Sequence, residues 1–459
     1  PYDIRDILMS TADDIGYDPL AMGAGMVNAS KAVEAVMSMN NPELMPSRLI
    51  VKPALVEFGT VEVGRKYFDT LSVLGNITGL TVEDYMFELK DVATYELAVN
   101  ATLIGEDGVS HYSRPDIAIV LPKDFLNYDM IVVKMIIPLE QFDVDGDYHA
   151  DIFPALSLHE WVDINGNGKW FSDVNENGIY DYPEEWEDEE INIIMYDYTE
   201  SNIHEITIGY PNMKVSVVNG AERRLVIGLS DFWAPLYEGK VLYNVTVEVQ
   251  AYKKVDNPHV SAKIVNNNVE VSLRVPRNTR PGLYYAMLKV KNAYNGEATI
   301  PVLYNVKVQL TCKGGGYGQK HLAPTVESLY DNEALGADID WSWRPDTGDW
   351  RFFFFEISNK LLKREPTFFT VVEWLNNKSD INIHVLAPYV DIFSEYWPEI
   401  MGPYTLEVVA ESEWGHLGEG RFMWKTNTHT AMEVILFEPT MPGLYEVILH
   451  NVLFDGSTS

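Results

Sequence analysis

The stretch YNVTVEVQ, residues 243–250, decides the fold class of this chain. Apolar side chains occupy every second position, at Tyr243, Val245, Val247 and Val249, and polar side chains lie between them. Successive side chains of a β-strand point to opposite faces, so this alternation predicts a strand with one buried face. A helix would instead need apolar residues three and four positions apart.

The same alternation recurs after residue 49, for example in VEVSLRV, residues 269–275, and turns rich in Gly, Pro and Asn separate such stretches. Many short strands divided by turn residues are typical of β-sandwiches. RPGLYYAMLKV (280–290) and MPGLYEVILHN (441–451) also resemble each other, since each places a Pro-Gly turn before an alternating strand. This echo predicts two units of similar build, and chance recurrence is the alternative.

Charge and composition exclude several classes of protein. The chain has 459 residues and a net charge of -34, which disfavours nucleic acid and anionic membrane as partners and favours divalent cations. Apolar residues make up 46% of the chain, enough for several cores. Its one cysteine, Cys312, rules out an internal disulfide. We expect no membrane span, because no apolar run reaches roughly 18 residues.

The first 40 residues differ from the rest, because their apolar residues recur at helical spacing. We expect one helix within residues 3–12 and a second after Gly25, capped by Asn28 or Ser30. The two expected apolar stripes consist of Ile4, Ile7, Leu8 and Thr11, and of Val27, Ala32, Val33 and Val36.

Residues 173–184, DVNENGIYDYPE, carry the most specific chemical signal. They match every fixed position of the twelve-residue calcium loop, in which alternate oxygen ligands converge on one ion and a glycine permits the sharp turn. The expected ligands are Asp173, Asn175, Asn177, the carbonyl of Ile179, Asp181 and Glu184. We therefore expect Ca²⁺ as the cofactor, in a loop that holds β structure together.

Two weaker loops precede this one. The first would use Asp163, Asn165, Asn167 and the carbonyl of Lys169, with Asp173 shared between the two loops. The second would use Asp143, Asp145, Asp147 and Asp151, although Tyr148 replaces the glycine. The alternative explanation for all three loops is a set of Asn-Gly turns on an acidic surface.

Other motifs are absent or less specific. The sequence contains no HExxH zinc motif, no P-loop and no GxSxG motif, and its Ser, His and Asp residues show no triad-like spacing. Five N-x-[ST] sequons predict glycosylation of a protein at a cell surface. These sequons are Asn28, Asn76, Asn100, Asn244 and Asn377.

Residues 7–33, ILMSTADDIGYDPLAMGAGMVNASKAV, resemble the C-terminal edge of a subtilisin-like serine protease domain. In that family a helix ends in a Ser-Thr-Ala run, here within residues 8–12, and a Gly-Ala-Gly-x-Val-Asn turn, here residues 23–28, leads into a closing helix. The later chain resembles the long tails of pyrolysin-like subtilases from heat-loving archaea. Residues 49–76 resemble the fibronectin-type-III-like domain that begins such tails.

The chain departs from the family at the site of catalysis. The family's Gly-Thr-Ser nucleophile motif should lie a few tens of residues before the Ser-Thr-Ala run, but only nine residues precede Ser10. No catalytic residue can therefore be assigned, and Ser10 and Asp13 are not triad members. We expect the chain to start inside a catalytic domain and to keep its last two helices.

The expected fold is mainly β, with tandem β-sandwich domains, fibronectin-type-III-like and related, after a short helical remnant of a subtilisin α/β domain. The expected division is residues 1–40 for the remnant, 45–215 for the first sandwich with a calcium-loop insertion at about 141–190, 216–312 for the second, 313–325 for a linker and 326–459 for the last.

The leading functional hypothesis is the non-catalytic C-terminal region of a secreted, calcium-binding subtilisin-like endopeptidase, serving stability, anchoring or assembly. Its partners would be the missing protease part or like subunits, and possible contacts include cell-surface or surface-layer proteins. One alternative is an extracellular structural subunit of a surface layer or filament. Another is a carbohydrate-binding β-sandwich module. Each places the chain outside the cell or on its surface.

Overall fold

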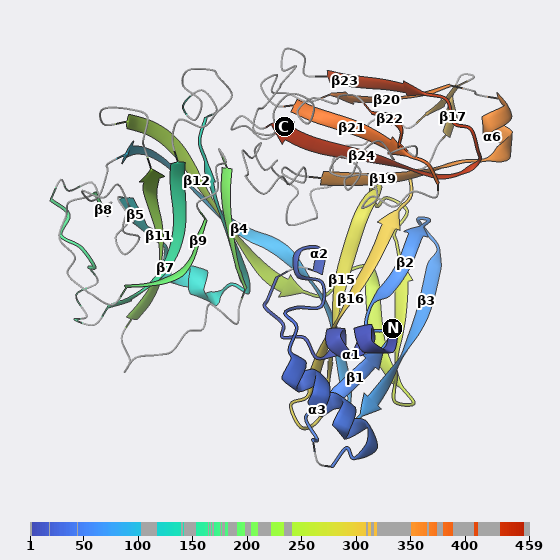
Figure 1. The fold of residues 1–459 in the computed structure, drawn as a ribbon, viewed down its shortest axis with the longest axis horizontal. Coiled ribbons are helices and arrows are strands. Elements are labelled where there is room, and N and C mark those ends of the chain that lie inside the picture. Colours follow the sequence, from blue (N-terminus) through green and yellow to red (C-terminus); the bar gives the residue numbers. More distant parts are fainter. Residues whose placement is uncertain are drawn as a thin grey trace.

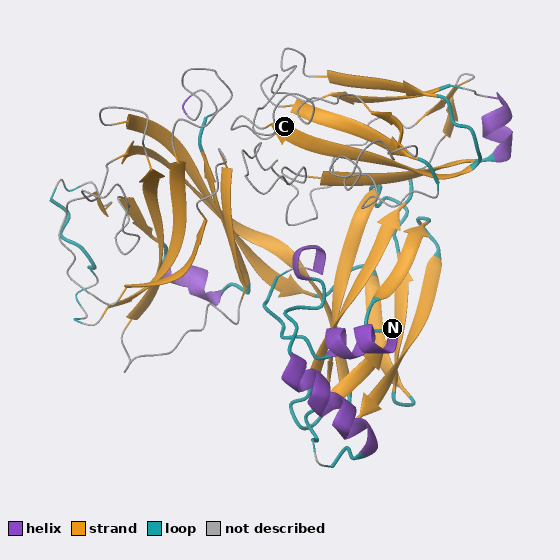
Figure 2. Cartoon of the chain, in the orientation of Figure 1, coloured by secondary structure: helices purple, strands orange, loops and turns teal. Residues whose placement is uncertain are grey.

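The structure is a computed structural model. It describes residues 2–101 apart from 18 and 44, then 117–138, 141, 153–163, 165, 167, 169–174, 176, 180–181, 191–197, 203–209, 222–233 and 241–308. It also describes residues 311–313, 316–318, 350–364, 367–373, 380–388, 408–411 and 432–453. The protein is mainly β with a few helices, as the alternation predicted (Figure 2).

The N-terminal region folds as three helices, α1 (Tyr2–Ser10), α2 (Pro19–Met22) and α3 (Ala29–Asn40). Asn28 caps α3 as predicted, because its Oδ1 accepts a hydrogen bond from the N–H of Lys31 at 3.0 Å. Backbone hydrogen bonds between Asp13 and Met26 close the turn that carries α2. Glycine is required in this turn at Gly25, whose φ is +119°.

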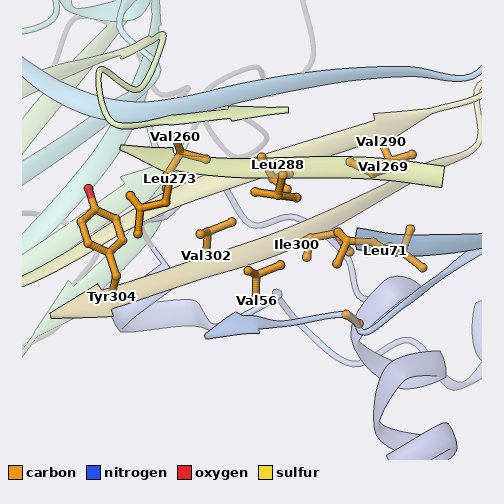
Figure 3. Packing of buried hydrophobic residues seen from close by; sticks show 14 of the residues in the cluster. Val56, Leu71, Val260, Val269, Leu273, Leu288, Val290, Ile300, Val302 and Tyr304 are labelled. Atoms are coloured by element: carbon orange, nitrogen blue, oxygen red, sulfur yellow. The ribbon is translucent and has the colours of Figure 1, made fainter. Parts of the chain in front are cut away.

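Two sheets face each other in the outer module, which comprises residues 49–92 and 252–308. The first sheet has the order β1 (Leu49–Lys52), β3 (Lys66–Gly75), β14 (Asn268–Arg274) and β13 (Val260–Val265). Strand β14 alternates as predicted, with Val269, Val271 and Leu273 fully buried. These side chains meet those of the facing sheet, including Val56, Leu288 and Ile300 (Figure 3).

The facing sheet has seven strands and extends beyond the outer module. Its order is β10 (Ile203–Gly209), β6 (Met130–Ile136), β12 (Val241–Val255), β4 (Thr81–Ala101), β15 (Gly282–Lys291), β16 (Glu297–Val306) and β2 (Val56–Val61). Strands β4 and β12 pair antiparallel from Met86 and Val255 at one end to Ala101 and Val241 at the other. This long pair leads out of the outer module and into a second core (Figure 1).

The second core belongs to the inserted module, residues 93–251. A five-stranded sheet lies against β6, β10 and the far half of the long pair. Its order is β8 (Tyr180–Asp181), β5 (Ile117–Val120), β11 (Glu222–Trp233), β7 (Phe153–Asp163) and β9 (Ile191–Asp197). The short helix η1 (Lys123–Asn127) contributes Phe125 to this core.

The two modules are nested, whereas the sequence suggested a serial division with a boundary near residue 215. One core contains both Leu71 and Val302, and the other is built from residues that lie between them in the chain, such as Ile131 and Ile227. The difference has a physical reason. The chain leaves and returns through two paired strands, so no polar or Pro-rich linker marks either crossing.

The C-terminal module combines a four-stranded and a two-stranded sheet around one core. The sheet orders are β19 (Trp350–Ile357), β24 (Gly443–Leu453), β21 (Asp380–Leu386), β22 (Val408–Glu411), and β20 (Phe368–Glu373) with β23 (Met432–Phe437). Helix α6 (Asn359–Arg364) follows β19. Part of the expected linker instead forms strand structure, because β17 (Thr311–Lys313) and β18 (Gly316–Gly318) pair antiparallel.

The two Pro-Gly echoes form the same local structure. Tyr284 Oη donates a hydrogen bond to the carbonyl of Arg280 at 3.0 Å, and Tyr445 Oη donates one to the carbonyl of Met441 at 2.9 Å. Each tyrosine lies near the start of its strand and bonds back to the backbone four residues earlier. We call this arrangement a tyrosine corner.

Candidate functional site

The structure fixes part of the predicted calcium region, which runs from the end of β7 to β8 of the five-stranded sheet. Asp163 ends β7 and is buried, while Asn165, Asn167 and Lys169 are exposed. Asp173 is half-buried and Asp181 belongs to β8. The remaining predicted ligands lie outside the described residues: Asn175, Asn177, Ile179, Glu184, Asp143, Asp145, Asp147 and Asp151.

Two short turns follow Asp163. The N–H of Asn167 donates to Asn165 Oδ1 at 2.9 Å, and the N–H of Lys169 donates to Asn167 Oδ1 at 2.7 Å. Such turns shape the chain whether or not an ion is bound. Within the described part of this region and of the whole chain, no group of three His, Cys, Asp or Glu side chains is arranged to hold a metal ion.

An aromatic anchor holds this segment against the sheet. Trp170 lies within the first predicted loop, before the shared Asp173, and is buried against Ala118, Trp161 and Val226. Its ring meets Phe171 edge-on, with centroids 4.9 Å apart. Strands β7 and β8, at which the segment begins and ends, are separated in the sheet by β5 and β11. The segment between β7 and β8 therefore runs across β11 and β5, and the buried Trp170 holds it against the sheet.

The same face of β7 contains a buried serine–histidine pair that the sequence did not single out. His159 Nε2 lies 2.7 Å from Ser157 Oγ, which itself donates to the carbonyl of Gly228 at 3.1 Å. The serine hydrogen is thus engaged, so the histidine is the donor in this pair. Burial lowers the pKa of His159 to about 4. A histidine that donates to the serine does not activate it, so the pair is structural.

The N-terminal helices attach to β1 through polar side chains. Asp6 Oδ1 accepts a hydrogen bond from the N–H of Ala54 at 3.0 Å. Ser10 Oγ accepts from the N–H of Val51 and donates to its carbonyl, at 3.0 Å in each case. The buried side of α1 therefore carries two polar residues, Asp6 and Ser10, beside Met9, which packs against the core of the outer module.

Apolar side chains of the same helices face outward. Ile4, Val27 and Val33 are 63%, 66% and 62% exposed. The buried side of α3 consists of small residues, Ala32, Ala35 and Ser38. Of the predicted apolar stripe of Val27, Ala32, Val33 and Val36, only Ala32 is buried against the protein. We define the apolar helical surface as Ile4, Met26, Val27, Val33, Val36 and Met37, all exposed.

Charged contacts hold the turn between α1 and α3. Asp13 pairs with Lys31 and accepts a hydrogen bond from Asn28 Nδ2 at 2.9 Å. The hydrogen bond from Lys31, followed by that from Asn28, lowers the pKa of Asp13. The next residue, Asp14, lies 3.4 Å from Lys289 Nζ and 3.8 Å from Lys254 Nζ.

This turn lies where the two nested modules meet. Lys254 is on β12 and Lys289 on β15, and both belong to the shared seven-stranded sheet. Gly209, at the end of β10 in the inserted module, approaches so closely that an added Cβ would lie 2.2 Å from the carbonyl oxygen of Ile15. The N-terminal segment therefore contacts both modules.

The sequons differ in their surroundings. The amide of Asn28 is engaged on both sides, by Lys31 and Asp13. Asn76 lies in a turn in which its Oδ1 accepts from the N–H of Thr78. Asn244 is an exposed residue of β12. The side chain of Asn100 and the whole of Asn377 lie outside the described residues.

No helix in the described part of the chain is long and apolar enough to cross a membrane. Searches for relatives gave no family: no protein-family model matches the chain, and no curated protein matches it significantly.

Proposed function

We propose that this chain is the non-catalytic C-terminal region of a secreted subtilisin-like endopeptidase, and that the apolar helical surface docks the catalytic domain. One observation carries the proposal. Helix α3 turns small residues toward the β structure, and apolar residues such as Val33 on α3 and Ile4 on α1 are exposed to solvent. Exposed apolar clusters on a protein mark surfaces that another protein covers.

The resemblance suggests that a subtilisin-like catalytic domain covers the apolar helical surface. Residues 7–33 resemble the closing helices of a subtilisin-like domain, and such helices would normally pack on the rest of that domain. A catalytic domain packed on these helices would explain why Val27, Val33, Val36 and Met37 point outward. It would also explain why α1 is fixed to β1 by Asp6 and Ser10, since the first β domain must be held close to the protease it stabilises.

The β modules would serve as a scaffold of immunoglobulin-like and fibronectin-type-III-like sandwiches. Strand order supports this assignment for the outer module. Its first sheet has the order of an A-B-E-D sheet, and β4, β15 and β16 follow the C-F-G order of the facing sheet. The tyrosine corners at Tyr284 and Tyr445 add support, because such corners recur in these sandwiches. The pairing of β13 with β14 favours the immunoglobulin type over fibronectin type III.

Calcium would hold the segment between β7 and β8 of the inserted module. The sequence of residues 173–184 supports this, together with the fixed positions of Asp173 and Asp181 at the end of that segment. Removing Ca²⁺ with a chelator is expected to lower the melting temperature, and Asp173→Ala is expected to weaken the calcium response. Glu57→Ala, an exposed residue of β2, is the matched control. An unchanged melting temperature and no Ca²⁺ binding in calorimetry would remove calcium from the proposal.

An extracellular location and glycosylation fit the same proposal. A chain with one cysteine has no disulfide of its own, so bound calcium would supply part of the stability that exported proteins need. Asn76 and Asn244 are the described sequons best placed for glycan. In Asn28 the nitrogen that would carry the glycan, Nδ2, donates a hydrogen bond to Asp13, whereas Asn76 uses its Oδ1.

The decisive experiment uses the protein isolated from its native source. Intact mass, peptide sequencing and labelling with a serine-directed phosphonate are measured on the same sample. The proposal expects a labelled polypeptide with a Gly-Thr-Ser motif, either continuous with this chain or co-purifying with it. A sample with no such polypeptide and no label would overturn the protease assignment.

A second experiment tests the surface itself. Val33→Ser with Val36→Ser is expected to release the labelled catalytic part, or to lower casein hydrolysis at high temperature, without changing the fold of the β modules. Val92→Ser, at an exposed valine of β4 outside the helices, is the control. If sedimentation instead shows that the double variant separates two copies of this chain, the surface joins like subunits and the structural-subunit alternative replaces the docking proposal.

A further inference from the structure

Four polar side chains line one face of the seven-stranded sheet in the inserted module. Lys134 on β6 and Gln250 on β12 are each only 1% exposed, and Tyr252 is also buried. Glu248 is half-buried. These four side chains face away from the core of the inserted module, because the alternate residues of both strands, such as Val133 and Val249, fill that core.

The strand register brings these groups together. In the antiparallel pair of β6 and β12, Lys134 lies directly opposite Glu248, and Val132 lies opposite Gln250. Lys134 and Gln250 are therefore diagonal neighbours on one face. Diagonal neighbours are within reach of long side chains.

The carboxamide of Gln250 is held at both ends. Its Nε2 donates to Glu248 Oε1 at 2.5 Å, and its Oε1 accepts from Tyr252 Oη at 2.5 Å. A phenol donating to the carbonyl oxygen makes the amide carbon more electrophilic. A carboxylate beside the amide nitrogen can move protons to and from it.

We propose that Lys134 and Gln250 form an intramolecular isopeptide bond, with Glu248 as the proton carrier. Glu248 takes a proton from the Lys134 ammonium, and the amine attacks Cδ of Gln250. Tyr252 Oη stabilises the oxyanion that develops on Oε1. Glu248 returns its proton to Nε2, the Cδ–Nε2 bond breaks, and ammonia leaves. Glu248 then takes the remaining extra proton from the new amide nitrogen, so its carboxyl group ends protonated. One amide replaces another, so no oxidant or second substrate is needed.

Burial and position favour this chemistry. A buried site disfavours the ammonium charge and excludes the water that would hydrolyse the intermediate. The reacting groups are preset by two paired strands, which gives the amine a high effective concentration. The bond would join β6 to β12 covalently in a chain that cannot form an internal disulfide. The competing explanation is a buried ion pair of Lys134 and Glu248 without reaction.

High-resolution mass spectrometry of the purified full chain distinguishes the two. The isopeptide bond makes the intact mass lower than the sequence mass by one molecule of ammonia. A protease digest should then contain a branched peptide that joins residues 134 and 250, and trypsin should fail to cleave after Lys134. A chain of full sequence mass, or ammonia loss mapped to other residues, would overturn the proposal.

Variants test the assigned roles. Glu248→Gln keeps the shape of the side chain but removes the proton carrier, so its mass should equal that of its own sequence. Lys134→Met should behave likewise. The control is Lys291→Met on β15, which should lose ammonia as the unchanged chain does. Persistent ammonia loss in Glu248→Gln would show that the bond does not form by this route.

Discussion

One oxygen atom joins Ser10 to both backbone groups of Val51. Ser10 Oγ accepts a hydrogen bond from the N–H of Val51 and donates one to its carbonyl, each 3.0 Å long. Val51 lies on β1, at the edge of the first sheet. The serine thus satisfies a buried strand edge as a neighbouring strand would.

Ser10→Ala is expected to destabilise the attachment of α1 by about 1–3 kcal/mol, because it leaves buried backbone groups of Val51 unsatisfied. The measurement is thermal unfolding together with limited proteolysis near α1. Ser30→Ala, an exposed residue of α3, should change stability by less than about 0.5 kcal/mol. Equal effects of the two substitutions would contradict the bonding role of Ser10.

Two glycines of one turn should respond differently to alanine. An added Cβ at Gly25 would lie 2.2 Å from the carbonyl oxygen of Asp13, whereas at Gly23 it would meet nothing within 4 Å. Both have positive φ, so Gly23→Ala should cost about 1 kcal/mol from backbone strain alone. Gly25→Ala should cost clearly more and open the turn, which hydrogen exchange at Met26 would detect. Similar exchange rates in both variants would rule out the close approach.

His159 should make the inserted module less stable in acid. Its pKa is about 4 in the folded protein, so between pH 6.5 and 4 the unfolded chain binds a proton that the folded chain does not. Stability is therefore full above pH 6.5 and falls as the pH is lowered, by about 2 kcal/mol at pH 5. Denaturant unfolding at pH 8 and pH 5 would show a smaller difference in His159→Gln than in the unchanged chain. The same pH dependence in both proteins would show that another group is responsible.

The two tyrosine corners should contribute similar stabilities to different modules. Tyr284→Phe and Tyr445→Phe each remove one hydrogen bond and should cost about 0.5–1.5 kcal/mol. Each ring keeps its stacking partner, Tyr304 or Phe355, so the loss isolates the hydroxyl group. Calorimetry that resolves the module transitions would assign each loss to its own module. Tyr294→Phe, at an exposed residue, should have little effect, and a loss as large as those at the corners would contradict the assignment.

Strand periodicity and capping could be predicted from the sequence because they are local. The alternation at residues 269–275 gave the buried face of β14 correctly, and Asn28 caps α3 as expected. The Pro-Gly echo was a real structural repeat. These features depend on side-chain direction and hydrogen bonding within a few residues.

Long-range features could not be predicted in the same way. The nested modules arise from pairing between β4 and β12, and a sequence does not show which strands pair. The outward direction of Val33 could not be predicted from its helical period, because the period does not show which face of α3 meets the β structure. The polar row of Lys134 and Gln250 appears only when strand register is known. The calcium loop remains a prediction, because several of its ligands, such as Asn175 and Glu184, lie outside the described residues.

The nesting of the modules has a mechanical consequence. The chain enters the inserted module through β4 and leaves it through β12, and these strands lie side by side in the sheet of the outer module. Tension applied between the two ends of the chain therefore passes through the outer and C-terminal modules and bypasses the inserted one. The inserted module would carry load only after β4 separates from β15, where the two strands pair between residues 81–85 and 287–291. The chain could thus stretch or anchor at its ends while the region with the predicted calcium loops stays unstrained.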